Sequence, residues 1–131
     1  MSEPILFADF QPGTILGEHL EIYEASMAYA WQKIFGENQS DDSAQAASIA
    51  VVLSMRAYLG VVSPRPPGNV HAREQFALAS LPHLGEKVRT VISCVSKIIK
   101  RERFYVDLEV KGTGDGGRAL FSGRMSLIWA A

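Results

Sequence analysis

Three carboxylates lie close together in the segment FGENQSDD, residues 35–42. They are Glu37, Asp41 and Asp42, and no histidine stands near them in the sequence. Two carboxylates held close together can share a proton and separate their pKa values, so that one serves as base and the other as acid. In this interpretation Glu37 is the base and Asp42 the acid. The alternative is a solvated loop in which Asp41 or Asp42 caps the next helix, whose dipole favours the charged carboxylate and so opposes a general acid.

One helix is predicted on each side of these carboxylates. Apolar residues recur at helical spacing in SMAYAWQKIFG, residues 26–36, which predicts a short amphipathic helix ended by a glycine. Residues 43–60, SAQAASIAVVLSMRAYLG, are apolar almost all round, so we predict a long helix that is buried on every side. The proline-rich segment SPRPPGN, residues 63–69, ends it.

Strands are predicted wherever the apolar period changes to two. A first strand is expected at residues 15–23, with Leu16, Leu20 and Ile22 mostly on one face. After the long helix, four consecutive antiparallel strands are expected, at residues 70–80, 87–99, 104–112 and 118–131. In the second of these four, Val88, Thr90, Ile92, Cys94, Ser96 and Ile98 are expected to share a face. One sheet wrapped around one helix, an α+β fold, accounts for this order.

The order of elements and two stretches of sequence resemble the MaoC-like acyl dehydratase and (R)-specific enoyl-CoA hydratase group of the hot-dog fold. FADFQPGTILGEHLEIYEASMAYAWQKIFGE resembles the family's opening, with a turn, a first strand and a helix that runs into the catalytic loop. PHLGEKVRTVISCVSKIIKRERFYVDLEVKGTGDGGRALFSGRMSLIW resembles its sheet half. The resemblance covers nearly the whole chain. It implies a single hot-dog domain over residues 1–131, with an antiparallel sheet around the helix at about residues 43–60.

The chain departs from this family at the family's most specific motif. Family hydratases carry Gly-Asp-x-Asn-Pro-x-His after the short helix, and the Asp and His activate water for addition to an enoyl thioester. Aligned on Gly36, Glu37 stands for the Asp, Gln39 for the Asn, Ser40 for the Pro and Asp42 for the His. The histidine is absent, and the family's longer segment before the central helix is mostly missing. The resemblance therefore implies a degenerate motif, with Glu37 and Asp42 as the catalytic candidates.

Five further residues are candidates for substrate binding. By the same resemblance, the N–H groups at the start of the long helix, at Ala46, Ala47 and Ser48, are expected to face a thioester carbonyl. Arg65 is a candidate contact to a CoA phosphate, the alternative being that its proline-rich segment is only a rigid connection. His71 heads a strand and suits proton transfer, the alternative being an exposed polar residue.

Composition argues against several other classes of protein. A net charge of −1 gives no basic surface for nucleic acid. The N-terminus has no signal-peptide pattern, and polar residues interrupt the most apolar stretch, so a cytoplasmic protein with no membrane partner is expected. Cys94 is the single cysteine and is expected to be a small buried side chain. No grouping has metal-ligand spacing, and neither a metal nor a cofactor is expected.

Three functions remain open at the level of sequence. The resemblance implies a lyase, an enoyl-CoA hydratase or acyl dehydratase, acting on an acyl-CoA or acyl-carrier thioester. The second possibility is a non-catalytic hot-dog subunit that supports a catalytic partner, and the third is a hot-dog acyl-CoA thioesterase. A homodimer through a sheet edge is expected, both from the family and because a long unpaired edge strand is a liability. A heteromer with a catalytic hot-dog subunit is the alternative.

Overall fold

The computed structural model of the 131-residue chain describes residues 3–27, 29 and 42–131, with side chains in the long helix described from Ala46 onward. Glu37 and Asp41 lie outside the described residues, and so does most of the short helix predicted at residues 26–36. Residues 25–27 are helical.

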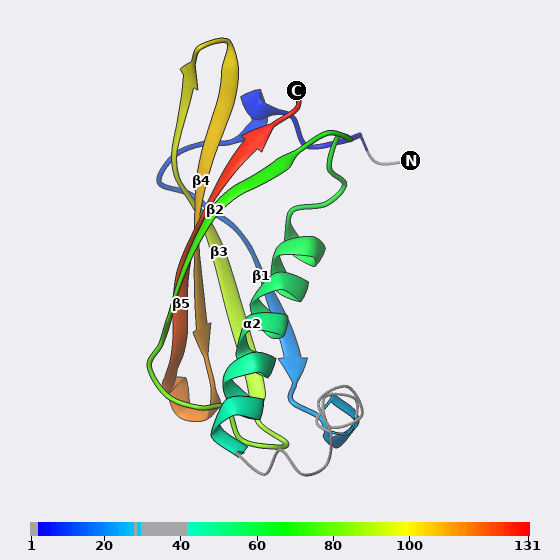
Figure 1. The fold of residues 1–131 in the computed structure, drawn as a ribbon, viewed down its shortest axis with the longest axis vertical. Coiled ribbons are helices and arrows are strands. Elements are labelled where there is room, and N and C mark those ends of the chain that lie inside the picture. The colour runs from blue at the N-terminus through cyan, green and yellow to red at the C-terminus, as the bar shows by residue number, and fades with distance from the viewer. Residues whose placement is uncertain (1–2, 28, 30–41) are drawn as a thin grey trace.

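Five antiparallel strands form one sheet, with order β1-β3-β4-β5-β2 (Figure 1). β1 spans Ile15–Ile22, β2 Val70–Leu78, β3 Lys87–Lys100, β4 Arg103–Thr113 and β5 Ala119–Trp129. Two short 3-10 helices, η1 (Phe7–Asp9) and η2 (Asp115–Gly117), complete the described elements. The predicted strands are confirmed, but β2 pairs with β5 rather than with the strand that follows it in sequence. β1 and β2 are therefore the edges of the sheet.

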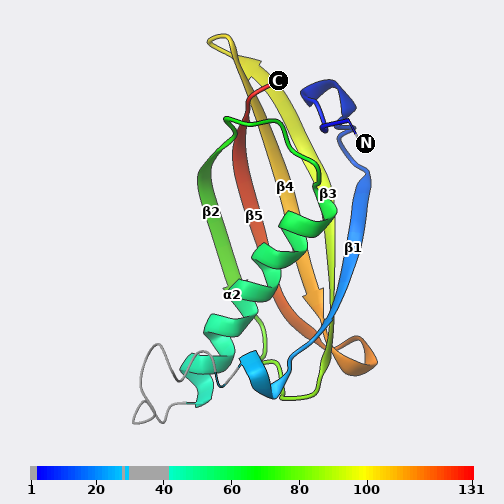
Figure 2. The ribbon, with the colours of Figure 1, turned by 90° about the vertical axis from the view of Figure 1, so that its right-hand side faces the viewer.

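The long helix α2, Asp42–Val61, crosses one face of the sheet diagonally, as Figures 1 and 2 show from two directions. Its bounds lie within one residue of those predicted. Its buried side packs into a core shared with β3, β4 and β5. Among the described residues, no helix is both long and apolar enough to cross a membrane. The helix side of this core is made of Ala46, Ile49, Ala50, Leu53, Ala57 and Tyr58.

The prediction that α2 is buried on every side is wrong for the single chain. Val51, Val52 and Leu59 are 39%, 44% and 48% exposed. The sheet covers one side of the helix, and the described part of the chain supplies nothing to cover the other. An apolar helix surface left exposed in one chain is typical of an interaction surface.

A β-bulge near the start of β1 overturns the predicted face of that strand. The register with β3 shifts between Ile15 and Gly17, so one extra residue is inserted. Leu16 packs against the core, whereas Leu20 is 50% exposed. After the bulge, Gly17, His19 and Glu21 lie on the side of the strand that faces α2, where Leu20 and Ile22 were expected. An extra residue moves every following side chain to the opposite face.

A second bulge does the same in β3. Val88, Thr90, Ile92 and Cys94 are buried as predicted, but the register with β4 shifts between Cys94 and Ser96. Ser96 pairs with Asp107, and Ile98 is 54% exposed. The continuation of the buried face through Ser96 and Ile98 is therefore corrected: both lie on the face away from α2. Cys94 is 1% exposed, as expected of a buried thiol.

A buried carboxylate ties together the loops at one end of the sheet. Glu86 is 4% exposed and accepts hydrogen bonds from the N–H groups of His83 and Asp115, each at 2.9 Å, and from the Arg118 guanidinium. Arg118 also donates to Ser80 Oγ at 2.7 Å. Burial alone would raise the pKa of Glu86, but these N–H donors and the guanidinium hold it below its ordinary value. The β2–β3 and β4–β5 connections thus share one charged centre.

Candidate functional site

The N-terminal end of α2 holds one group of the predicted site residues. Asp42 is the first residue of the helix, Ala46 is buried, and Ala47 and Ser48 are half-buried. In a helix that begins at Asp42, the free N–H groups lie in the first turn, whereas those of Ala46, Ala47 and Ser48 belong to the internal ladder. A thioester oxygen at this end would meet the first turn, with the small side chains of the next turn allowing close approach. Glu37 lies outside the described residues.

Arg65 and His71 lie at the other end of α2. Nη1 of Arg65 donates to the carbonyl oxygens of Leu59 and Val62, at 3.0 and 2.8 Å, and so satisfies free carbonyls at the end of the helix. Its positive charge interacts favourably with the negative end of the helix dipole. The guanidinium also lies 5.6 Å from the ring centroid of Tyr58, a cation–π contact. Arg65 is therefore held in place, and among the described residues its Nε and Nη2 groups donate no hydrogen bond.

A cavity of about 280 Å³ lies beside Arg65. Its polar lining comprises Tyr58, Arg65, Asn69 and His71, and Leu127 contributes an apolar wall. The rings of His71 and Tyr58 meet edge to face, with centroids 6.3 Å apart. Burial raises the pKa of Tyr58, an effect that the nearby Arg65 partly opposes, so the phenol stays protonated near neutral pH. The cavity therefore combines the side-chain donors of Tyr58, Arg65, Asn69 and His71 with an apolar lining.

Asn69 is the residue of this cavity that most needs an explanation. Its Oδ1 accepts a hydrogen bond from the Ala130 N–H at 2.7 Å, which fixes the side chain. Its Nδ2 is buried and has no hydrogen-bond partner among the residues that the structure describes. A buried donor without a partner costs about 1–3 kcal/mol. Because Nδ2 exposes less than 1 Å² of surface, a ligand in the cavity bonds to it only if the cavity wall moves.

The two groups of predicted residues do not form one site within a single chain. Ser48 and Val61 are thirteen residues apart in α2, which places the helix ends about 20 Å apart at 1.5 Å per residue. Arg65 and His71 come together, as do Ala46, Ala47 and Ser48. Neither Tyr58 nor Asn69 could be singled out from sequence, because Tyr58 is one of many apolar residues in the helix and Asn69 follows a Pro-Pro-Gly turn.

A third cluster joins β1 to the C-terminal half of α2. His19 Nε2 lies 3.1 Å from Glu21 Oε1, and Arg56 Nη2 lies 2.7 Å from Glu21 Oε2. A carboxylate bound to one imidazole nitrogen fixes the ring and leaves the other nitrogen free for proton transfer. That nitrogen, Nδ1, is turned toward Gly60, where a Cβ would lie 3.5 Å from it. The pair could have been predicted from sequence, because alternate residues of a strand share a face.

Neither a metal site nor a match to a known family explains why these side chains are grouped. Across residues 3–27, 29 and 42–131, no three His, Cys, Asp or Glu side chains are grouped so that they could hold a metal ion. No protein-family model matches the chain, and no curated protein matches its sequence. The similarity to known proteins lies in the three-dimensional structure.

Several solved structures match almost the full length of the chain. A MaoC-like dehydratase from Rhodospirillum rubrum superposes with a TM-score of 0.79 at 13% identity, over 95% of this chain and 96% of that one. The unliganded (R)-hydratase from Pseudomonas aeruginosa gives 0.71 at 14% identity, over 96% and 86%. A 3R-hydroxyacyl-ACP dehydratase complex from Mycobacterium tuberculosis gives 0.66 at 14% identity, over 89% and 96%. The chain has the hot-dog fold.

The hot-dog fold places the clusters relative to one another. α2 is the helix that the sheet wraps, and the cavity beside Arg65 and the first turn of α2 lie at its two ends. The histidine–carboxylate pair of His19 and Glu21 lies on the edge strand β1, beside Arg56 and Gly60 in the C-terminal half of α2. The superpositions, at 11–14% identity, establish the shared fold alone, and activity has to be argued from the residues themselves.

Proposed function

We propose that this hot-dog protein binds an acyl thioester carried by CoA or by an acyl carrier protein, in the manner of a hydratase or dehydratase. The observation that carries the proposal is the cavity at the C-terminal end of α2, where the unpaired Asn69 amide joins Arg65 and His71. The likeness in fold to MaoC-like dehydratases and (R)-hydratases gives it context.

The amide-bearing pantetheine arm, common to both carriers, suits this cavity better than a phosphate. Arg65 already stands against the negative end of the helix, which disfavours an added anion there. Once the cavity wall moves to expose Asn69 Nδ2, a neutral amide carbonyl supplies the acceptor that this atom lacks, and Leu127 offers apolar contact to the methylene groups. We therefore expect Arg65 to contact the pantetheine arm rather than the CoA phosphate.

A second copy of the chain is proposed to unite the two ends of α2. The exposed residues Val51, Val52 and Leu59 are centred near Met55. A two-fold axis perpendicular to the helices at this surface runs them antiparallel, so Ser48 of one copy faces about residue 62 of the other. The cavity of one copy then lies beside the first turn of the other helix. The edge strand β2, exposed along almost all of its length, is continuous with such a contact.

The mass of the protein in solution tests this assembly. Val52→Lys is expected to convert a dimer into a monomer in analytical ultracentrifugation, because it places a charge within the contact. Ile98→Lys is the matched control, since Ile98 is 54% exposed but lies on the opposite face of the sheet. A monomeric wild-type protein, or a dimer unaffected by Val52→Lys, would contradict the proposed contact. A heteromer would show instead as co-purification with a hot-dog chain that carries the missing histidine.

The catalytic step is proposed for one of two acid–base pairs. Glu37 and Asp42 are the pair from the degenerate motif, and His19 with Glu21 is the pair that the structure brings together. Either can transfer the proton in addition of water to an enoyl thioester. Loss of hydration of crotonyl-CoA in Glu37→Gln, with His19→Gln still active, assigns the first pair. The reverse result assigns the second.

If neither pair hydrates crotonyl-CoA, two further assays distinguish the remaining alternatives. Thioester binding without hydration supports the non-catalytic subunit. Release of free CoA thiol from a saturated acyl-CoA supports the thioesterase, in which one carboxylate directs water at the thioester carbonyl. Failure to bind an acyl thioester of CoA or of an acyl carrier protein, together with no co-purifying catalytic hot-dog chain, would contradict all three functions.

A further inference from the structure

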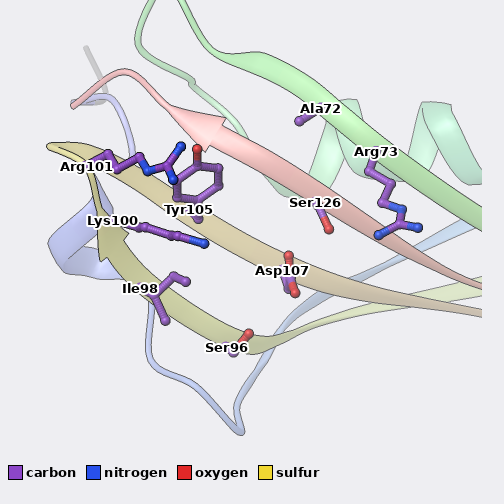
Figure 3. A pocket seen from close by; sticks show the side chains of 9 residues that line it. All are labelled: Ala72, Arg73, Ser96, Ile98, Lys100, Arg101, Tyr105, Asp107 and Ser126. Carbon is purple, nitrogen blue, oxygen red and sulfur yellow. The ribbon is translucent and has the colours of Figure 1, made fainter.

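The face of the sheet opposite α2 is hollowed rather than flat. A hollow of about 350 Å³ lies over β2, β3, β4 and β5, and Figure 3 shows the side chains that line it. One cross-strand row forms its floor: Ser96 pairs with Asp107, Asp107 with Ser126, and Ser126 with Arg73. Two of these four residues are serines, so the floor is low between larger neighbours. We call this hollow the outer pocket.

Two β-bulges border the outer pocket at this same row. The bulge in β3 between Cys94 and Ser96 turns Ser96, Ile98 and Lys100 outward. The bulge in β2 between His71 and Arg73 adjoins the other end of the row. Bulges are frequent where a strand must re-aim side chains at a site. Irregularity on both sides of one row is therefore a second indication, independent of charge, that this part of the sheet is shaped for a ligand.

The walls of the outer pocket carry an excess of positive charge. Arg73, Lys100 and Arg101 line it together with a single carboxylate, Asp107. Figure 3 shows Arg73 and Lys100 reaching toward Asp107 from opposite sides, and Arg101 beside the ring of Tyr105. Among the ion pairs of the described residues, none involves these three cations. The chain as a whole has a net charge of −1, so this concentration is local.

An adjoining hollow extends the positive surface. It shares Arg73, Asp107 and Ser126 with the outer pocket and adds Gln75 and Arg124. Arg124 likewise appears in none of the ion pairs of the described residues. A group with two or more negative charges is what such a cluster binds best, and arginine suits phosphate in particular.

We propose that the outer pocket is a binding site for a small hydroxylated phosphate ester, a sugar phosphate in chemical class. The cations Arg73, Lys100 and Arg101 receive the phosphate. The carboxylate of Asp107 and the hydroxyls of Ser96 and Ser126 bond to sugar hydroxyls, and the ring of Tyr105 forms a flat wall. The size of the hollow lies at the lower end of the range for small-molecule sites, which fits a compact ligand. This site lies on the other face of the sheet from the proposed thioester site.

Titration calorimetry with ribose-5-phosphate, inorganic phosphate and ribose tests the proposal on the full chain. We expect ribose-5-phosphate to bind saturably, inorganic phosphate at least about tenfold more weakly, and ribose not at all, because both parts of the site must be filled. Arg73→Gln is expected to weaken both phosphate ligands at least about tenfold. Asp107→Asn is expected to weaken ribose-5-phosphate and to leave inorganic phosphate unchanged or tighter, since it removes a negative charge.

Lys111→Gln is the matched control, because Lys111 is an exposed cation of β4 outside the outer pocket. It is expected to change none of these affinities. No saturable binding of ribose-5-phosphate at millimolar concentration, or equal losses in Arg73→Gln and Lys111→Gln, overturns the proposal. Crotonyl-CoA binding is expected to be the same in Arg73→Gln as in wild type. Failure of the outer pocket and failure of the thioester site are therefore separate results.

Discussion

Replacement of Glu86 by glutamine is expected to be among the most destabilising single changes of a polar side chain in this protein. Oε1 accepts from His83 N–H and from Arg118, and Oε2 accepts from Asp115 N–H at 2.9 Å. In Glu86→Gln the amide oxygen can still accept from His83 N–H and Arg118, but it no longer carries a negative charge. The new NH₂ group then faces the Asp115 N–H, so two donors confront each other in a site that is 4% exposed.

The magnitude follows from the number and type of bonds that change. A hydrogen bond to a charged group is worth about 1.5–3 kcal/mol, and a broken buried ion pair costs about 3–5 kcal/mol. Because glutamine retains part of the network, we expect a loss of about 3 kcal/mol. For a chain of this length that corresponds to a fall in Tm of about 10 °C. Urea unfolding followed by tryptophan fluorescence measures the free energy directly.

The stability lost in Glu86→Gln should also depend on pH, in a direction that the pKa of Glu86 determines. The pKa of Glu86 lies below its ordinary value of 4.5 in the folded protein, so folding favours the ionised form. Its contribution is full above the unfolded pKa and is lost as the pH falls through the lowered pKa. Since glutamine does not titrate, the stability difference between wild type and Glu86→Gln should shrink in acid below about pH 4.5.

Glu18→Gln is the control for this comparison. Glu18 pairs with Arg89 across two strands, but its side chain is 45% exposed, and exposed ion pairs contribute about 0–1 kcal/mol. If Glu86→Gln cost no more than Glu18→Gln, or if its effect were the same at every pH, the account of Glu86 as a shared charged centre would be refuted.

Three further predictions concern other buried contacts. Gly114→Ala should destabilise the protein by about 1–3 kcal/mol, because a Cβ there would lie 2.0 Å from Glu86 Oε2 and expel the carboxylate; chemical denaturation checks this. Trp129→Phe should cost at least about 1 kcal/mol in the same assay, since it removes the 2.8 Å hydrogen bond from Trp129 Nε1 to the Ile5 carbonyl; no loss would mean that this N-terminal segment does not dock. Burial raises the pKa of Cys94, so its thiol should react with a disulfide reagent at mildly alkaline pH only after unfolding; fast reaction of the native protein would contradict this.

The main elements were predictable because their periodicity is strong. The helix at residues 43–60 and the strands after it follow from apolar spacing and from the glycines and prolines between them. The bulges were not predictable in this way, because one extra residue carries no mark of its own in a sequence such as ISCVSK. Each bulge exchanges the faces of all later residues, and so Leu20 and Ser96 were placed on the wrong side.

The composition of the candidate site was predictable only in part. Arg65 and His71 were singled out by residue type, and they do lie together. Asn69 was not singled out, because its importance depends on a hydrogen bond to Ala130, sixty-one residues away, that leaves Nδ2 without a partner. The exposed side of α2 was misjudged for a related reason: apolar residues show that a helix is covered, but not that its own chain covers it.

Binding of octenoyl-CoA to wild type and to Asn69→Asp tests the central claim most directly. The substitution keeps an oxygen for the Ala130 N–H but replaces the unpaired Nδ2 donor with an acceptor, so it opposes a ligand carbonyl without a change of shape. Titration calorimetry should show saturable binding by wild type and an affinity at least about tenfold lower for Asn69→Asp. A folded wild-type protein that does not bind the thioester, or equal binding by both proteins, would contradict the proposed thioester site.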